Sequence, residues 1–465
     1  MPNKPRAGDA AAFLQAAVRE NMLSPGGAKE LAAQAAASDK PIAELCVSLG
    51  RLTAIQADAI DGLVNPASVA DGFQVEGLLG HGAIGIVYRA LQPSLSRTVA
   101  LKTIRASRLA GKDGSSGKAA ARFRQEAVAI AKLAHPNIVT AYDYGARDDR
   151  LFLAMEMVDG VDLESLISTA GRLDESTAWR LAQQVAAALA HAHELGVVHR
   201  DIKPANLLLT EAPAGYPLPP GVPLVKVTDF GLARLMGAVG DEHTTRLTLD
   251  GATMGTPHYM APEQVEDADV GFQADIYALG ATVFHLISGK PPFAGRTVMK
   301  VFAAKMGGEE ADLDSLPEDI SQAGRELLAS MLAYRPADRP ASYGALLSQL
   351  REVIGGESGT STTLGTTLSS VVKASAGGRL SMQPTQLVDA TRGGSKSPQK
   401  AWRWVAAALC VGGLAIAAAV GPAAVPGAGA PPERQYELDA TGGGLAPLFN
   451  GVDVFGWTGR GASPA

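Results

Sequence analysis

The chain has 465 residues and a formal net charge of −6, from 41 Lys and Arg against 47 Asp and Glu. Hydrophobic residues make up 46%, which is enough for a sizeable core and excludes a chain that is disordered throughout. The mildly acidic balance argues against a protein that binds nucleic acid by neutralising phosphates. Cys46 and Cys410 lie far apart, which excludes a disulfide scaffold and a cysteine-based zinc site.

Residues 1–66 are predicted to form a small helical module. Helix-start signals stand at Pro41 and Thr53, before runs with helical spacing. A helical spacer without a partner is the alternative. Residues 1–12 lack the apolar run of a signal peptide, so the segment before any membrane span is expected to stay in the cytoplasm.

Residues 73–354 are predicted to form an α+β domain. Strand-like runs come first, at 73–75, at 98–102 and around Ile138 and Leu151, and a helix-like run spans 119–133 among them. The pattern after Asp162 is mostly helical, notably over 177–195. This order indicates two unlike lobes, a small β-rich N-lobe and a larger helical C-lobe.

The composition changes after residue 354. Residues 355–400 are rich in Gly, Ser and Thr, which predicts a disordered linker. Residues 401–425 are predicted to form one transmembrane helix, because no charge occurs from Trp404 to Pro432 and a helix of this length spans about 37 Å. A buried or linking run of alanines is the alternative.

The flanks of this apolar segment predict its orientation. Lys396, Lys400 and Arg403 lie before or at its N-terminal end, which places the N-terminal side in the cytoplasm. Trp402 and Trp404 suit an interfacial anchor. Residues 426–465 would then be a short extracytoplasmic segment, whose Leu448–Trp457 stretch resembles the start of a β-sandwich domain.

A glycine-rich motif follows the first strand. Gly80-His81-Gly82-Ala83-Ile84-Gly85-Ile86-Val87 fits G-x-G-x-x-G-x-V between two strand-like runs. Such glycines let backbone N–H groups approach phosphate oxygens. A strand after the turn, in place of a helix, favours a flap over phosphates and disfavours a dinucleotide-binding helix start.

A lysine and a glutamate are candidates for one ion pair. Lys102 ends the apolar run Thr98-Val99-Ala100-Leu101-Lys102, where an unpaired charge would be costly. Glu126, on the predicted helix that follows, could reach it across the N-lobe. An ordinary lysine at a strand edge is the alternative if no other motif matched.

Three further motifs follow in order: His199-Arg200-Asp201-Ile202-Lys203-Pro204-Ala205-Asn206, Asp229-Phe230-Gly231 and Ala261-Pro262-Glu263. With the glycine motif and Lys102, they make the chain resemble a eukaryotic-like bacterial Ser/Thr protein kinase over about residues 73–350. The resemblance implies the two-lobed protein kinase fold, with ATP and Mg²⁺ as cofactors. Residues 49–60 resemble, loosely, the helical module that precedes many bacterial membrane kinases.

The resemblance also implies roles for residues. Asp201 would be the catalytic base, Lys203 would meet the γ-phosphate, and Asn206 and Asp229 would hold magnesium. Lys102 would hold the α- and β-phosphates, paired with Glu126. The residues implied around the nucleotide are Leu79, Gly80, Gly82, Gly85, Val87, Ala100, Lys102, Met155 as gatekeeper, Glu156 and Val158 as hinge, Asp162 near the ribose and Leu208 under the base.

Further residues would support the site. Glu263 would pair with Arg339, and Asp275 would brace the catalytic loop. Lys203 resembles the lysine of Ser/Thr kinases, and residues 255–260 resemble a peptide-docking stretch. Arg200 beside Asp201 implies control by a phosphorylated activation loop. The candidate sites in that loop are Thr244, Thr245, Thr248 and Thr253.

The sequence thus predicts a single-pass membrane Ser/Thr protein kinase with its catalytic domain in the cytoplasm. Its partners would be ATP, proteins with Ser or Thr acceptors and the membrane, without nucleic acid. Autophosphorylation between two copies of the chain would involve a homodimer. Two alternatives remain: a pseudokinase that signals as an ATP-binding scaffold, and a binding module in which the kinase fold relays ligand capture by an external domain.

Overall fold

A computed structural model describes residues 7–82, 85–109, 116–230, 257–265 and 270–356. All of them belong to one compact unit, Met1–Val388. The linker, the transmembrane helix and the C-terminal segment predicted for 357–465 lie outside the described residues, as do the four candidate threonines of the activation loop. Among the described helices, none is both long enough and apolar enough to span a bilayer.

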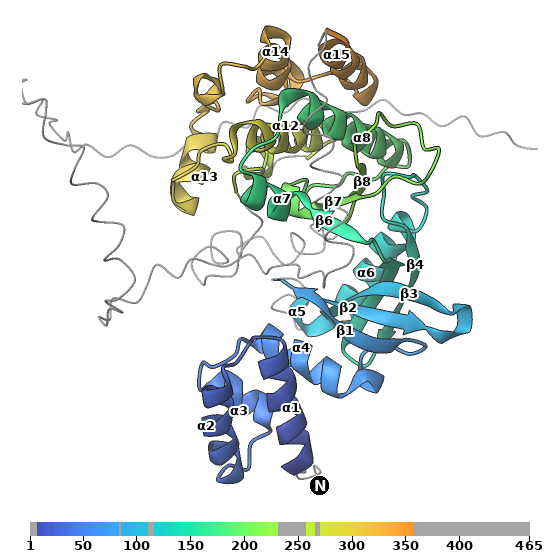
Figure 1. Ribbon diagram of the computed structural model, residues 1–465, viewed down its shortest axis with the longest axis vertical. Coiled ribbons are helices and arrows are strands. Elements are labelled where there is room, and N and C mark those ends of the chain that lie inside the picture. Colours follow the sequence, from blue (N-terminus) through green and yellow to red (C-terminus); the bar gives the residue numbers. More distant parts are fainter. Residues whose placement is uncertain (1–6, 83–84, 110–115, 231–256, 266–269, 357–465) are drawn as a thin grey trace, which may run out of the picture. The chain divides into compact units, whose positions relative to one another are not determined.

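The N-terminal residues form four helices, as the sequence predicted: α1 (Ala7–Arg19), α2 (Pro25–Ala36), α3 (Ile42–Ser48) and α4 (Ala54–Val64). We call α1–α4 the N-terminal module (blue in Figure 1). Thr53 and Gln56 form a reciprocal capping box that fixes where α4 begins. Phe13, Leu31 and Ile60 are almost fully buried in a core of the module's own.

The N-lobe is a five-stranded antiparallel sheet in the order β1-β2-β3-β5-β4 (Figure 1). Its strands are β1 (Gln74–His81), β2 (Ile86–Gln92), β3 (Arg97–Arg105), β4 (Ala141–Arg147) and β5 (Arg150–Glu156). Two helices, α5 (Ala106–Leu109) and α6 (Ser116–Ile130), follow β3. The sequence predicted the second helix over 119–133, three residues too far along the chain at either end.

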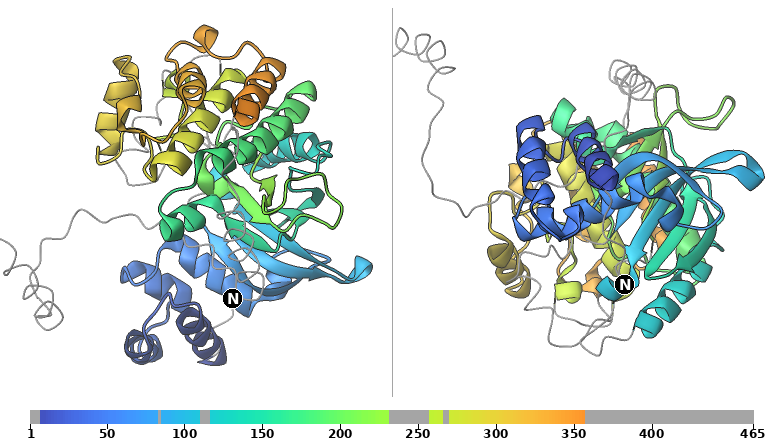
Figure 2. Two further views of the ribbon diagram at one scale, coloured as in Figure 1. Left: turned by 45° about the horizontal axis from the view of Figure 1, so that its top comes forward. Right: turned by 90° about the horizontal axis from the view of Figure 1, so that it is seen from below.

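Both faces of this sheet are covered, because side chains alternate along each strand. Ile104 and Leu153 pack with Phe123 and Ala127 of α6 on one face. The opposite face includes Leu101 and ten further apolar residues of the sheet and of the segment that enters it: Ala59, Val69, Ala70, Phe73, Ile86, Tyr88, Ala90, Val99, Phe152 and Ala154. Ala59 belongs to α4, so the N-terminal module is packed against the N-lobe (Figure 2).

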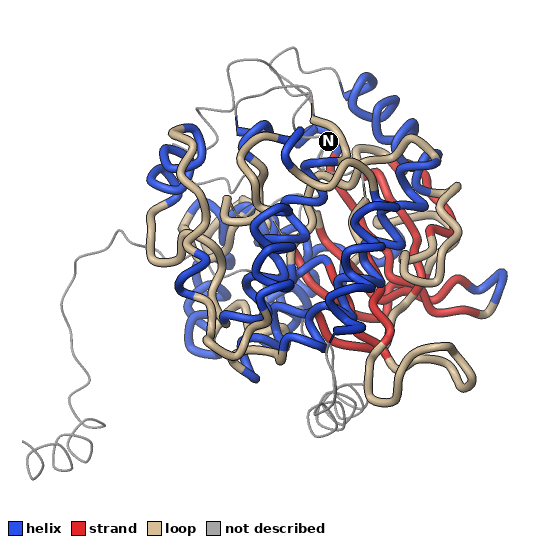
Figure 3. Tube along the Cα trace, turned by 90° about the horizontal axis from the view of Figure 1, so that it is seen from above, coloured by secondary structure: helices blue, strands red, loops and turns tan. Residues whose placement is uncertain are grey.

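The C-lobe is mainly helical. Its helices are α7 (Leu163–Ala170), α8 (Glu175–Glu194), α11 (Pro262–Val265), α12 (Gln273–Ser288), α13 (Val298–Met306), α14 (Gln322–Met331) and α15 (Tyr343–Gly356). A small antiparallel sheet joins them, with β6 (Gly160–Asp162), β7 (Leu207–Thr210) and β8 (Leu224–Val227). In Figure 3 the strands, in red, lie together beside the helices, in blue.

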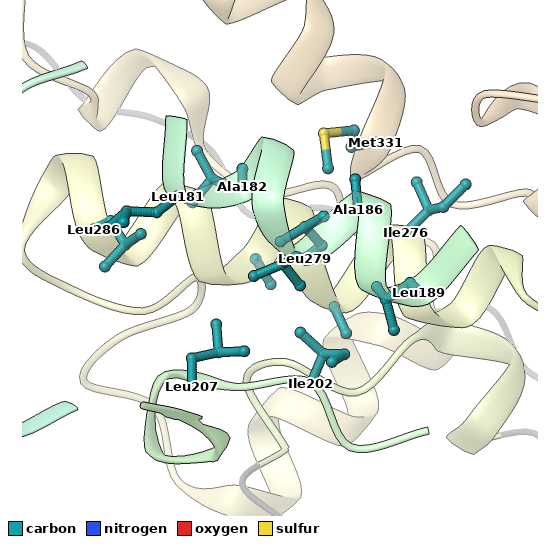
Figure 4. Close-up of a cluster of buried hydrophobic side chains, with 14 of the residues drawn as sticks. Leu181, Ala182, Ala186, Leu189, Ile202, Leu207, Ile276, Leu279, Leu286 and Met331 are labelled. Carbon is teal, nitrogen blue, oxygen red and sulfur yellow. The ribbon is translucent and has the colours of Figure 1, made fainter. Parts of the chain in front are cut away.

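The core of the C-lobe anchors the loop that carries the central motif. Leu181 and Leu189 of α8 pack with Leu279 of α12 (Figure 4). Ile202 within the motif and Leu207 directly after it, each 1% exposed, belong to the same cluster. The polar residues of the motif are therefore held between two buried anchors.

A buried ion pair joins two segments of the C-lobe. Arg339 donates to both carboxylate oxygens of Glu263, at 2.6 and 2.9 Å, with both side chains almost fully buried. Arg339 also donates to the carbonyls of Gln273, Ala333 and Tyr334. This is the pair that the sequence predicted, and its remaining donors are satisfied by backbone, as a buried charge requires.

Candidate active site

The predicted catalytic loop, residues 199–206, is oriented by one buried carboxylate. Asp275, which is 1% exposed, accepts the backbone N–H groups of His199 and Arg200 at 2.8 and 2.7 Å. Burial raises the pKa of Asp275, and these hydrogen bonds together with the nearby His199 oppose that rise. Arg200 has a positive φ of 68°, a strained conformation that these contacts hold in place. The predicted brace is thus present.

Three polar groups meet in this loop. Lys203 Nζ donates to Asp201 Oδ2 at 2.9 Å, and Asn206 Nδ2 donates to the same oxygen at 3.0 Å. Asn206 Nδ2 also donates to the backbone carbonyl of Asp201 at 2.7 Å. Because its amide nitrogen points at Asp201, the carbonyl oxygen of Asn206 is left as the ligand atom for a cation.

The two lobes meet at an ion pair between Lys102 and Asp229. Lys102 Nζ lies 2.8 Å from Asp229 Oδ2. Burial works against a charge on Asp229, but the charges of Lys102 and Lys203 and the hydrogen bond from Lys102 outweigh it and hold its pKa below the usual range. Asp229 has a φ of 67°, and Thr228 N donates to Asn206 O at 3.0 Å, which joins the two candidate metal ligands.

Glu126 lies half-buried on α6, on the side of the sheet that also carries Lys102. The ion pair that the structure gives for Lys102 is with Asp229. The pairing of Lys102 with Glu126 therefore stays a prediction.

The glycine motif runs from β1 into β2. Gly82 N donates to Gly85 O at 2.9 Å and closes the turn, whose tip at 83–84 is not described. A Cβ at Gly85 would lie 2.4 Å from the carbonyl oxygen of Thr103, whereas one at Gly82 would meet nothing within 4 Å. Gly85 is therefore required by packing on β3, while Gly82 borders open space, as a residue that faces a ligand should.

Four of the residues predicted around the nucleotide form one apolar group. Ala100, Met155, Val158 and Leu208 belong to the same cluster, and Ala100 faces Met155 across the β3–β5 pair. Val87 lies opposite Lys102 in the β2–β3 register. A small cavity behind Met155 is lined by Ile130, Val139, Leu153, Met155, Val227, Thr228, Asp229 and Phe230.

Two predicted residues make other contacts as well. The Asp162 carboxylate caps α7 by accepting Ser165 N at 2.8 Å, and Ser165 Oγ also donates to it. Lys226 of β8 donates to the Glu156 carboxylate at 2.9 Å and lies 2.8 Å from its second oxygen. Lys226 ties the hinge to the strand that leads to Asp229. Lys226 was not predicted from the sequence, because its partner Glu156 lies 70 residues earlier in the chain.

A buried lysine supports the described part of the stretch 255–260, which was predicted to dock peptides. Lys305 of α13, with 0% exposure, donates to the carbonyls of His258 and Met260. Burial lowers the pKa of Lys305 to about 7, Arg339 adds to this shift and Glu263 opposes it. Tyr259 bonds to His285 at 2.6 Å. Sequence reasoning gave no sign of Lys305, because a lysine late in an amphipathic helix is usually solvated.

The comparisons with known proteins agree with this geometry. Residues 73–350, about three fifths of the chain, match the family model described as the protein kinase domain. The antiparallel N-lobe sheet and the helical C-lobe fit that family. The chain belongs to the protein kinase domain family.

Bacterial relatives match over the same part. The chain is 38% identical over 290 residues to the serine/threonine-protein kinase pkn3 of Myxococcus xanthus, covering 62% of this chain and 50% of that protein. It is 31% identical to PrkC of Bacillus subtilis (58% and 39% covered) and 34% identical to PknD of Mycobacterium tuberculosis (59% and 38%). The chain thus matches half or less of the length of these relatives.

Alanine at the two described glycines of the turn should separate packing from ligand contact. Gly85→Ala is expected to lower the free energy of unfolding by about 1–3 kcal/mol, because the new methyl group collides with the backbone of β3. Gly82→Ala should leave it unchanged within about 0.5 kcal/mol. Urea unfolding of both variants measures this. Equal stability of the two would contradict the packing derived for Gly85.

Proposed function

We propose that the chain is a Ser/Thr protein kinase that transfers the γ-phosphate of Mg·ATP to serine or threonine hydroxyls of proteins. The observation that carries the proposal is the arrangement of two contact groups, Lys102 with Asp229 and Asp201 with Lys203 and Asn206, through contacts of 2.7–3.0 Å. The backbone hydrogen bond from Thr228 N to Asn206 O joins the two groups. Family membership and the names of the relatives support the reaction class.

In this mechanism the protein mainly positions groups and offsets charge, because the transition state of phosphoryl transfer is loose. Asp201 orients the acceptor hydroxyl and takes its proton late, while Lys203 offsets charge on the γ-phosphate. Lys102 holds the α- and β-phosphates. The backbone of Gly80, Gly82 and Gly85 covers the phosphates, and Leu79 and Val87 cover the adenine.

The donor set fits magnesium. Asn206 offers an amide oxygen and Asp229 a carboxylate kept ionised by neighbouring lysines. Magnesium prefers few protein oxygens and completes its octahedral shell with water and phosphate oxygens. Within the described residues no cluster of three or more His, Cys, Asp or Glu could hold a metal by itself. Bound there, the ion would neutralise charge on the phosphates.

Asp201→Asn tests the reaction directly. We expect kcat to fall about 10²–10⁴-fold with little change in the affinity for Mg·ATP, since the amide can neither accept the proton nor orient the hydroxyl as well. Transfer of labelled γ-phosphate to a basic protein acceptor measures it. Asp319→Asn is the control, because Asp319 pairs with Arg172 at the surface. Turnover near that of the parent chain in Asp201→Asn would refute the proposal.

A pseudokinase is the alternative function, and the same assay separates it. A scaffold of that kind would bind Mg·ATP but transfer no phosphate in the parent chain. The pairing of Lys102 with Asp229, the contact of Asn206 with Asp201 and the backbone hydrogen bond from Thr228 to Asn206 that joins the two favour the enzyme.

We further propose activation by autophosphorylation between two copies of the chain. Arg200 is placed beside Asp201 by the brace from Asp275, and its Nη2 donates to Val270 O at 3.3 Å. A guanidinium at this place can pair with a phosphothreonine. Mass spectrometry after incubation with Mg·ATP should find phosphate on Thr244, Thr245, Thr248 or Thr253. An unmodified 232–260 segment would contradict this route.

Membrane anchoring through residues 401–425 is proposed from hydropathy and flanking charge alone, with the kinase domain in the cytoplasm. This segment lies outside the described residues. Deleting it should move the protein from the membrane fraction to the soluble fraction, which fractionation of cell lysates measures. The same distribution for both forms would remove the anchor and leave the enzyme proposal intact.

A further inference from the structure

One carboxylate of the N-terminal module enters the N-lobe and meets three arginines. Asp58 of α4 has a side chain that is 7% exposed. Arg105 at the end of β3 donates to it through Nη2 at 2.6 Å and through Nε at 3.2 Å. Arg150 of β5 donates at 2.6 Å, and Arg108 of α5 lies at 3.7 Å. We call Asp58 and these arginines the Asp58 cluster.

Helix α4 is seated closely on the sheet around this cluster. The buried hydroxyl of Tyr88 lies 3.2 Å from the carbonyl oxygen of Ala59 and 3.4 Å from that of Asp58, and donates to them. A Cβ at Gly62 would lie 2.2 Å from the Tyr88 hydroxyl, so only glycine allows α4 to approach this far. Ala59 itself is 0% exposed. The contact is therefore specific in shape as well as in charge.

Strand β3 connects this contact with the nucleotide side. Ala100 and Ile104 pack on the α6 side, and Lys102 lies between them, whereas Val99 and Leu101 belong to the α4 side. Arg105 continues the second series and reaches Asp58. Lys102 and Arg105 belong to one strand that is paired with β5 over both positions, so a shift of β3 that frees Arg105 also moves Lys102, three residues away.

The other two arginines extend the contact to the elements around β3. Arg108 lies on α5, the short helix that follows β3. Arg150 is the first residue of β5, and β5 pairs with β3 along its whole length. The Asp149 carboxylate accepts Ser107 N at 2.9 Å and Ser107 Oγ at 2.6 Å, which joins α5 to the β4–β5 turn. One carboxylate thus holds together the three segments that set the position of β3.

Removal of this carboxylate would leave an uncompensated charge. Arg150 is only 4% exposed, and its other nearby acid, Asp61, is 3.7 Å away and half-exposed. Three guanidinium groups would then face one another without their shared acceptor. Relief requires movement of the end of β3, of α5 or of the β4–β5 turn, because a buried unpaired charge is strongly unfavourable.

We propose that the N-terminal module is a positioning element of the kinase, in which Asp58 holds the end of β3 through Arg105 and so keeps Lys102 in place for the phosphates of ATP. Asp58 is a positioning residue, since it touches no nucleotide group. The inference rests on the proposed role of Lys102. It assigns a function to residues 7–64, for which a mere spacer was the alternative.

The test measures the affinity for Mg·ATP by calorimetry in the full chain, with Asp201→Asn as background because this change slows turnover and is expected to leave the affinity for Mg·ATP almost unchanged. Asp58→Asn and Arg105→Gln are each expected to weaken binding about 2- to 30-fold. The double variant should bind Mg·ATP with about the affinity of the single variant that binds it less tightly, because both changes break the same contact between Asp58 and Arg105. Glu30→Gln, which breaks an exposed pair with Arg51 inside the module, is the control and should change nothing.

Thermal unfolding of each variant separates positioning from stability. Lower thermal stability with unchanged affinity for Mg·ATP would overturn the proposal and reduce the module to a structural cap. If Asp58→Asn does not fold, the test uses Arg105→Gln and Arg108→Gln, because both arginines are half-buried. Their affinity for Mg·ATP and their thermal stability are then compared in the same way. A background chain that binds no Mg·ATP would instead contradict the proposed kinase function.

Discussion

The site depends above all on the buried carboxylate of Asp275. It holds two successive backbone N–H groups of the catalytic loop and so maintains a left-handed residue at Arg200. Ile202 and Leu207 are fixed in the core of the C-lobe, and this restricts the orientation of the side chains of Asp201, Lys203 and Asn206. The chemistry therefore relies on a loop oriented before any ligand arrives, which is how preorganised sites stabilise developing charge.

The sheet of the N-lobe makes different contacts on its two faces. One face carries Lys102, and the N-terminal module packs against the other. Alternation along β3 sends Lys102 toward Asp229 and Arg105 toward Asp58. The same strand thus takes part in two ion pairs with carboxylates from outside the N-lobe. Such a strand can pass a displacement from the module to the nucleotide side without any further connecting element.

Motifs made of neighbouring residues were predictable from the sequence. The catalytic loop and the helices of the module follow from local patterns and from the resemblance. Contacts between distant segments were predictable only where the resemblance supplied them, as for the pair of Glu263 with Arg339. Asp58 lies in the apolar run Ala57–Ile60, and an acidic residue in such a run is expected to have a charged partner. The neighbouring sequence, however, does not identify Arg105 or Arg150 as that partner. Lys226 and Lys305 were missed for the same reason, since their partners are defined only by tertiary packing.

The central claim is that Lys102, Asp201, Asn206 and Asp229 act on one nucleotide. The most direct measurement is an experimental structure of the chain with Mg²⁺ and a non-hydrolysable ATP analogue. The account predicts a metal ion held by Asn206 and Asp229, with Lys102 at the α- and β-phosphates and Asp201 facing the γ-phosphate. A nucleotide bound elsewhere, or a metal ion held by neither Asn206 nor Asp229, would contradict it.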